Sequence, residues 1–239
     1  TVVNFQNPSG CTTSDARKAA ILELARRKGF FILEDDPYRY LRFEGKPTKS
    51  YFEMAGEDRR VVYLGSFSKI IAPGVRCGWC AFPLNLKDKL LEIRLSLELC
   101  PPALTQAAVF EFLRANDLRA HLVKLAREYK NRRDSLVQAL NREASRLGLR
   151  LSVPKGGFFL WGTCEGIADM FEFAQYAARE KRVGFIPGRF FFPLEGEGAD
   201  SIRFAFAKAA PEQSREGAAR FADALESYRR IFSPGRNLQ

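Results

Sequence analysis

Three short polar clusters hold the side chains of this sequence that could do chemistry. They are Asn7-Pro8-Ser9-Gly10, Asp35-Asp36-Pro37-Tyr38, and Ser66-Phe67-Ser68-Lys69 with Arg76 seven residues later. A lysine amine can act as a nucleophile, and serine hydroxyls with an arginine fork suit phosphate oxygens. Taken singly, each cluster has an ordinary explanation as a turn, a helix cap or a solvated charge. Their order along the chain is what makes them informative.

Two of these clusters directly follow apolar runs that are typical of buried parallel strands. Phe30-Phe31-Ile32-Leu33 leads into the acidic cluster, Val61-Val62-Tyr63-Leu64 leads into the lysine cluster, and 78–82 is a third run. The alternation of strands and helices predicts an α/β doubly wound sheet. In such sheets the ligand lies beyond the carboxyl ends of the strands, where these polar residues fall.

Helix signals complete the first half and dominate the second. Thr13 or Ser14 can cap a helix that runs to about Arg27, with Gly29 as its stop. From about residue 86 the pattern becomes helical and then mixed, which predicts a second, α+β unit with a boundary near residue 116. The expected elements are helices at 90–97, after Pro102, and at 122–147, 168–179 and 212–228, and strands at 151–153, 158–161, 183–186 and 202–206.

Composition excludes several other classes of protein. Of the 239 residues, 46% are hydrophobic and 28% are charged, and the sequence contains no uncharged apolar run long enough to span a membrane. The formal charge of +10 is spread over helices, so we expect solvated helix faces and no nucleic-acid partner. Five cysteines, an odd number in a chain of this size, argue against a disulfide framework. With no signal peptide visible, a cytoplasmic location is expected.

The clusters, together with three later motifs, resemble class I/II pyridoxal-phosphate-dependent aminotransferases of fold type I. The segment Ser66-Phe67-Ser68-Lys69-Ile70-Ile71-Ala72-Pro73-Gly74-Val75-Arg76 is similar to the cofactor-lysine segment of that family. The resemblance is greatest to the subgroup of 2-aminoadipate, aromatic and kynurenine aminotransferases. The other matching motifs are Phe5-Gln6-Asn7-Pro8-Ser9-Gly10, Glu34-Asp35-Asp36-Pro37-Tyr38, Pro154-Lys155-Gly156-Gly157-Phe158-Phe159, Pro187-Gly188-Arg189-Phe190-Phe191 and Ile202-Arg203-Phe204.

The resemblance implies a role for each polar residue at the cofactor ring. Lys69 forms a Schiff base with pyridoxal 5′-phosphate and, once displaced by substrate, serves as general acid and base. Asp35 pairs with the protonated pyridine nitrogen, which keeps the ring an electron sink. Asp36 could do the same on sequence alone, but the family pattern favours the Asp three residues before Tyr38. Tyr38 and Asn7 hydrogen-bond the phenolic oxygen.

The resemblance also implies how anions are held. Ser66, Ser68 and Arg76 bind the cofactor phosphate, and Arg203, with Asn7 nearby, binds the substrate α-carboxylate. Arg203 stands between two apolar positions of a strand, where an inward-facing arginine needs an anion. The single histidine, His121, is expected on a helix surface, and no metal site is proposed.

The family's fold is implied as well. A mostly parallel large-domain sheet flanked by helices is expected over 1–115, with an interdomain helix, and a smaller α+β domain over 116–239. The matched motifs correspond to the later part of a family member, so we expect a chain that lacks the N-terminal part of the fold and a homodimer of the full-length form. Substrates would be an amino acid and a 2-oxo acid.

Three alternatives remain open. One is another fold-type-I enzyme, such as a carbon–sulfur lyase or a decarboxylase, since Lys69 and Asp35 serve all of them. Another is the aminotransferase-like effector domain of a DNA-binding transcription regulator. The last is a non-catalytic remnant that acts only as a dimer partner.

Overall fold

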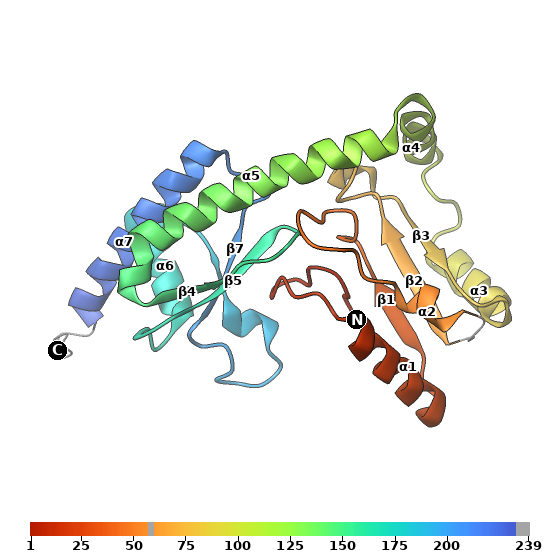
Figure 1. The fold of residues 1–239 in the computed structure, drawn as a ribbon, viewed down its shortest axis with the longest axis horizontal. Coiled ribbons are helices and arrows are strands. Elements are labelled where there is room, and N and C mark those ends of the chain that lie inside the picture. The colour runs from red at the N-terminus through yellow and green to blue at the C-terminus, as the bar shows by residue number, and fades with distance from the viewer. Residues whose placement is uncertain (57–59, 233–239) are drawn as a thin grey trace. The chain divides into compact units, whose positions relative to one another are not determined.

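The computed structural model describes residues 1–56 and 60–232, which form two compact units (Figure 1). The first unit comprises Thr1–Gln6 and Cys11–Ala126, and the second comprises Asn7–Gly10 and the chain from Arg127 onward. The division falls inside the long helix α5 (Leu118–Ala144), whereas the sequence places the functional boundary just before this helix. Asn7–Gly10 belongs to the second unit although it lies near the start of the chain.

Helix α1 (Asp15–Lys28) forms where its end signals predict it. The Ser14 hydroxyl accepts a hydrogen bond from the Arg17 backbone N–H, so Ser14 rather than Thr13 is the cap. Gly29 ends the helix in the left-handed conformation with φ 75°. Glycine has no Cβ, so it adopts this conformation with little conformational strain. Three basic residues in the last turn complement the helix dipole.

The sheet of the first unit is mixed, with strand order β1-β2-β3 (Ile32–Asp35, Val61–Ser66 and Gly78–Ala81). β1 and β2 pair in parallel, as the sequence predicts, but β3 runs antiparallel to β2. β1 begins and ends two residues later than the apolar run Phe30–Leu33. The strand therefore includes Glu34, which is buried. Val2 forms a parallel bridge to Asp35 on the other edge of β1.

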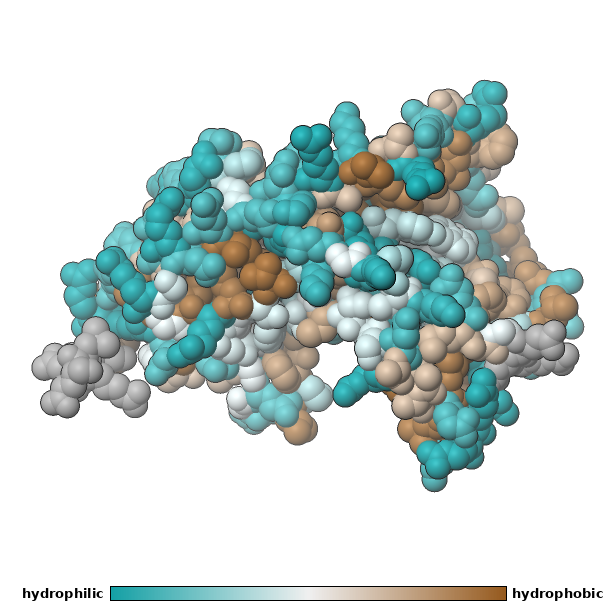
Figure 2. Space-filling view, viewed as in Figure 1, coloured by the Kyte–Doolittle hydropathy of each residue, from teal (hydrophilic) through white to brown (hydrophobic). Residues whose placement is uncertain are grey.

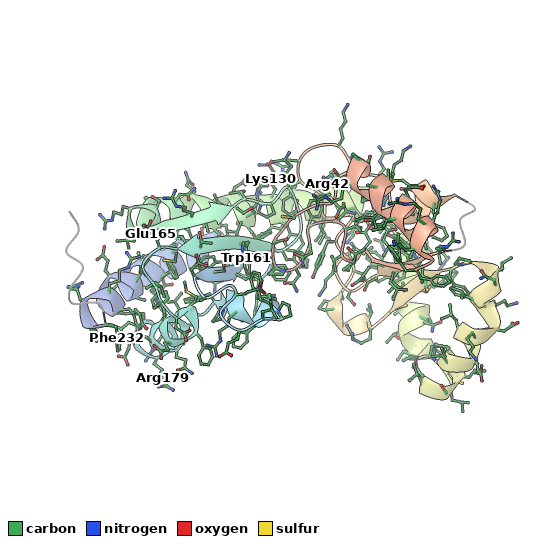
Figure 3. All side chains as sticks on the ribbon, turned by 90° about the horizontal axis from the view of Figure 1, so that it is seen from below. Arg42, Lys130, Trp161, Glu165, Arg179 and Phe232 are labelled. Carbon is green, nitrogen blue, oxygen red and sulfur yellow. The ribbon has the colours of Figure 1, made fainter. Side chains whose placement is uncertain are left out.

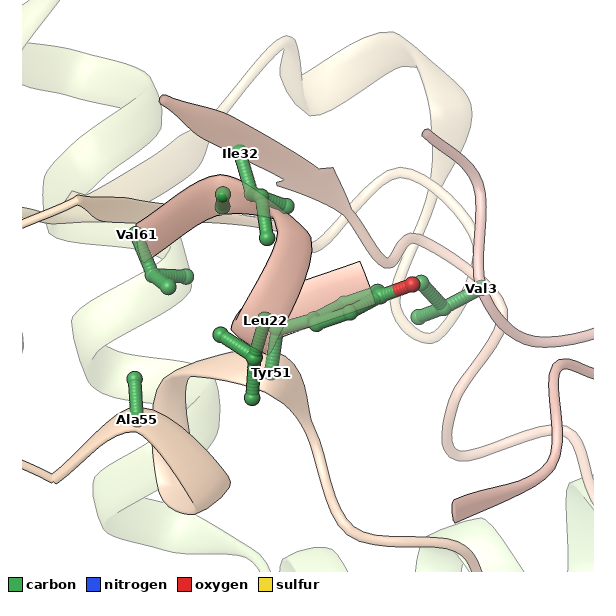
Figure 4. Packing of buried hydrophobic residues seen from close by; sticks show 7 residues of the cluster. Val3, Leu22, Ile32, Tyr51, Ala55 and Val61 are labelled. Carbon is green, nitrogen blue, oxygen red and sulfur yellow. The ribbon is translucent and has the colours of Figure 1, made fainter. Parts of the chain in front are cut away.

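One face of this sheet is covered and the other is open. α1 and α2 (Tyr51–Ala55) bury a cluster that includes Val3, Leu22, Ile32, Tyr51 and Val61, which Figure 4 shows gathered against the sheet. α2 is fixed by a capping box, in which Ser50 and Glu53 satisfy each other's backbone N–H groups. On the opposite face the apolar side chains of Phe31 and Leu33 are 49% and 57% exposed.

The rest of the first unit is helical and carries much apolar surface. It contains η1 (Pro73–Val75), η2 (Leu84–Leu86), α3 (Lys87–Leu97), α4 (Ala103–Ala115) and the start of α5. Apolar residues reach the surface around α4 (Figure 2), where the side chain of Leu104 is 83% exposed. Exposed apolar surface on this scale marks a contact region in most proteins.

The second unit contains an antiparallel sheet whose strands lie in the order β4 (Leu149–Ser152), β5 (Phe159–Cys164), β7 (Ser201–Ala205) and β6 (Ile186–Pro187), with helices on one face. Along β5, Leu160 and Cys164 are buried in alternation with Phe159 and Trp161. The remaining elements are η3 (Ser145–Leu147), α6 (Met170–Lys181), η4 (Gly188–Phe191) and α7 (Pro211–Phe232).

Aromatic rings dominate the core between this sheet and its helices. The Phe173 ring on α6 is fully buried, and its centroid lies 5.4, 5.6 and 5.3 Å from those of Phe185, Phe221 and Tyr228. These tilted and edge-on contacts are favourable aromatic geometries. Within residues 1–56 and 60–232, no helix is long and apolar enough to cross a bilayer.

Replacing Phe173 with alanine tests this core. Removing the ring should lower the free energy of unfolding by about 3–5 kcal/mol, because apolar contacts are lost and a cavity is left. Urea denaturation measures the change. Phe190→Ala is the matched control, since that ring is 58% exposed, and a loss of similar size in both variants would contradict the assigned core.

Candidate functional site

The carboxyl ends of β1 and β2 lie side by side and carry most of the predicted site residues. Asp35 pairs in register with Leu64, and the Asp36 N–H donates to the Leu64 carbonyl at 3.0 Å. Two residues later Ser66 ends β2, and the loop with Lys69 follows. Parallel pairing therefore brings a carboxylate and a lysine loop to one edge of the sheet.

The two neighbouring aspartates point to opposite faces of β1. Asp36 is 2% exposed, and the Asn4 side-chain amide donates to both of its carboxylate oxygens at 3.0 Å. Burial raises the pKa of the Asp36 carboxyl despite this hydrogen bonding. Asp35 is exposed on the open face of the sheet. Asp36 is therefore committed to the interior, and Asp35 is the carboxylate that a ligand can reach.

The loop after β2 gathers hydroxyl and guanidinium donors. The Ser66 hydroxyl accepts from the Ser68 backbone N–H at 3.1 Å, and the Arg76 Nη1 donates to the Ser68 hydroxyl at 3.4 Å. Arg76 also donates to the Pro73 carbonyl at 3.3 Å and adopts the left-handed conformation with φ 47°. This donor set fits a phosphate group, because hydroxyls and a guanidinium offer several hydrogen bonds to anionic oxygens.

Lys69 lies within this donor set in the chain, and Tyr38 follows the neighbouring strand β1. Lys69 lies half-buried in the turn between β2 and η1. Tyr38 is buried, and its carbonyl accepts from the Leu41 N–H at 2.8 Å in the turn that follows β1. Beneath the loop, Trp79 packs so closely on Gly65 that a Cβ there would lie 2.2 Å from the indole, which explains the need for glycine.

The second unit holds the other two predicted residues, and they are in direct contact. The Arg203 Nη1 on β7 donates to the Asn7 side-chain carbonyl at 2.7 Å. The guanidinium carbon lies 4.4 Å from the Phe159 ring centroid and 4.9 Å from that of Phe191. Arg203 shares the aromatic face of the sheet with Trp161, its partner in register, which Figure 3 labels on β5.

Close packing joins the first and the fourth motif of the chain within the second unit. Gly10 has φ 70°, and a Cβ on it would lie 2.8 Å from the Pro154 side chain. The Pro154 carbonyl in turn accepts from Arg133 Nη1 of α5 at 2.7 Å. The Asn-Pro-Ser-Gly turn is therefore held against the strand segment that supplies Phe159, and this fixes where Asn7 meets Arg203.

The predicted residues thus form two groups. Asn7 and Arg203 are together in the second unit, and the first unit contains the group Asp35, Tyr38, Ser66, Ser68, Lys69 and Arg76. The sequence alone indicated no role for Asn4, whose side-chain amide hydrogen-bonds the buried Asp36. It also indicated no role for the Phe159 and Phe191 rings that contact Arg203. Within residues 1–56 and 60–232, no three His, Cys, Asp or Glu side chains cluster as a metal site.

Comparison with known proteins gives one consistent picture. Residues 1–221 match the family described as aminotransferase class I and II. The aromatic-amino-acid aminotransferase 1 of Thermococcus litoralis is 36% identical over 227 residues, which is 95% of this chain and 53% of that protein. An uncharacterized HTH-type transcriptional regulator of Bacillus subtilis, YisV, is 33% identical over 87% of this chain and 42% of its own.

The fold agrees with the sequence comparison. The crystal structure of the alpha-aminoadipate aminotransferase from Thermus thermophilus, complexed with N-(5′-phosphopyridoxyl)-L-leucine, superposes with a TM-score of 0.89 at 31% identity. The match covers 96% of this chain and 59% of that one. The chain spans about half the length of the relatives that it matches.

The buried state of Asp36 predicts a pH dependence of stability. Its pKa is raised from the ordinary 3.8, so the folded protein keeps this proton to higher pH than the unfolded chain does. The free energy of unfolding should therefore fall as pH rises from about 3.8 to the raised pKa. Asp36→Asn removes this contribution, so the fall should be shallower in the variant.

Urea denaturation at several pH values across that window measures the two slopes. Asp35→Asn is the matched control, because it removes the neighbouring exposed carboxylate in place of the buried one. Equal slopes in the wild type and Asp36→Asn would contradict a buried carboxyl.

Proposed function

Because the chain belongs to the class I and II aminotransferases, we propose that the protein moves an amino group between an amino acid and a 2-oxo acid with pyridoxal 5′-phosphate. One observation carries the proposal. The end of β2 places Lys69 in a loop with Ser66, Ser68 and Arg76, beside the strand end that exposes Asp35.

The cofactor supplies an electron sink for the charge that develops at the substrate Cα. Lys69 would hold the cofactor aldehyde through its side-chain amine. The same amine would act as the general base that takes the proton from the substrate Cα and as the general acid that passes it on to the cofactor. A lysine on a half-buried turn between a strand and a 3-10 helix is well suited to both tasks.

Other residues of the first unit would hold the cofactor. Asp35 keeps the pyridine nitrogen protonated by pairing with it, and Tyr38 donates to the phenolic oxygen. Ser66, Ser68 and Arg76 bind the phosphate, and the contact of Arg76 with the Ser68 hydroxyl supports this assignment. Asp36 takes no part in this set, since its carboxylate is engaged with Asn4.

Arg203 would bind the substrate α-carboxylate. The Phe159 and Phe191 rings hold the orientation of the guanidinium, whose N–H donors lie in its own plane, the direction from which a carboxylate makes two parallel hydrogen bonds. Asn7 orients the guanidinium by accepting one of its N–H groups through the side-chain carbonyl.

The complete protein would act as a homodimer on soluble amino acids and 2-oxo acids. The exposed apolar residues of α3 and α4, among them Leu95, Leu97 and Phe110, support a contact surface in the first unit. A cytoplasmic location stays a prediction.

The similarity to an HTH-type transcriptional regulator favours a second candidate function, an effector domain that binds an amino compound. The two candidates differ in turnover. An aminotransferase converts glutamate, aminoadipate, tyrosine or kynurenine to the 2-oxo acid and passes the amino group on, whereas an effector domain binds without releasing product. A lyase or decarboxylase would release ammonia with a thiol, or carbon dioxide, instead.

Lys69→Ala tests the central residue. The complete gene product, mixed with pyridoxal 5′-phosphate, should show the visible absorbance of a lysine-bound cofactor, and the variant should lose both this band and amino-group transfer. A fall in turnover of at least about 10³-fold is expected, because the covalent amine and the proton carrier are lost together. Lys46→Ala, on an exposed loop, is the control. A Lys69→Ala protein that retains the band would refute the assignment.

Arg203→Lys tests the carboxylate site. Loss of a bidentate pair should raise KM for the amino acid by about 10- to 100-fold, because charged hydrogen bonds contribute about 1.5–3 kcal/mol. Cofactor binding should be unchanged. Arg150→Lys on β4 of the same sheet is the control, since Arg150 is exposed. An unchanged KM in Arg203→Lys would remove this residue from substrate binding.

A further inference from the structure

Lys69 lies in a turn whose backbone is closed by hydrogen bonds from the residues after the lysine to Phe67 before it. The Phe67 carbonyl accepts from the N–H groups of Ile70 and Ile71 at 3.2 and 2.8 Å, and the Phe67 N–H donates to the Cys77 carbonyl at 3.1 Å. These bonds are local and follow from the turn itself. They leave the carbonyl of Ile70, directly after Lys69, to be satisfied from elsewhere.

His121, the only histidine in the sequence, forms a hydrogen bond with the Ile70 carbonyl. The Nε2 of His121 lies 2.7 Å from the Ile70 oxygen, a contact that joins residues 51 positions apart. Since a carbonyl oxygen only accepts, Nε2 must carry the proton and donate. Ile70 is 2% exposed, so water does not readily replace this donor.

The imidazole is held in place from two sides. At the start of α5 the Asp117 carboxylate accepts from the N–H groups of Arg119 and Ala120 at 2.8 and 3.2 Å, which fixes the first turn of the helix. The Phe112 ring of α4 contacts the imidazole edge-on, with the centroids 5.2 Å apart. His121 is therefore a half-buried, oriented group and not the surface residue that the sequence suggests.

We infer that His121 is a positioning residue for Lys69. By fixing the Ile70–Ile71 peptide, one residue beyond Lys69, its Nε2–H sets the direction in which the lysine side chain leaves the turn that also carries Ser66 and Ser68. The Phe67 carbonyl ties the two sides of the turn together across the lysine, and His121 adds a bond from α5 to the side that follows the lysine. The inference rests on the proposed function, because it assigns His121 to the residue that holds the cofactor.

The test compares His121→Leu, which removes the donor, with His121→Gln, which keeps an N–H of similar reach. The complete gene product is titrated with pyridoxal 5′-phosphate, and the dissociation constant and the visible band of lysine-bound cofactor are recorded. His121→Leu should bind the cofactor about 3- to 10-fold more weakly and show a smaller band per bound cofactor, the effect of one lost hydrogen bond. His121→Gln should restore most of both.

Controls separate positioning from folding and from the function itself. Val123→Ala, a 65% exposed position on the same helix, should behave as the wild type, and urea denaturation without cofactor reports stability. The inference is overturned if His121→Leu matches the wild type, or if its loss follows stability alone and His121→Gln restores nothing. If the wild type shows no visible absorbance band that depends on Lys69, the proposed function is wrong, and this inference is wrong with it.

Discussion

The parallel pairing of β1 with β2 is the constraint on which the candidate site depends. Because Asp35 lies opposite Leu64 in register, the strand end that exposes a carboxylate and the loop that begins at Ser66 meet at one edge of the sheet. A slip of one residue would turn Asp35 inward and Asp36 outward, since strand side chains alternate between faces. The register therefore decides which aspartate is available to a ligand.

A buried, hydrogen-bonded carboxylate on β1 stabilises that register. Glu34 is fully buried, and its two carboxylate oxygens accept the N–H groups of Tyr51 and Phe52 at 3.0 Å at the start of α2. Lys18 of α1 is buried as well, and its amine donates to the Thr48 hydroxyl at 2.9 Å and to the Lys49 carbonyl at 2.6 Å. Burying a carboxylate is costly unless it is hydrogen-bonded, so a slip of β1 would leave Glu34 without its partners. The Lys18 bonds hold α1 against the segment before α2.

Sequence reasoning succeeded where the signal is local. Ser14 and Gly29 mark the ends of α1 because capping and the left-handed conformation depend on the residue itself. It was less successful for β1, where the acidic Glu34 and, directly after the strand, Asp36 are buried, and for the antiparallel direction of β3. A buried carboxylate is indistinguishable from an exposed one until its hydrogen-bond partner, here Asn4 from another segment, is known. His121 gives no signal at all, because its partner is a backbone carbonyl far along the chain.

Peptide mapping after borohydride reduction of the complete, cofactor-loaded protein tests the central claim most directly. The reagent fixes the bond between cofactor and lysine, and mass spectrometry then locates the pyridoxyl group. The account predicts a single label on Lys69, in the peptide that follows β2. A label on any other lysine, with Lys69 unmodified, would contradict it.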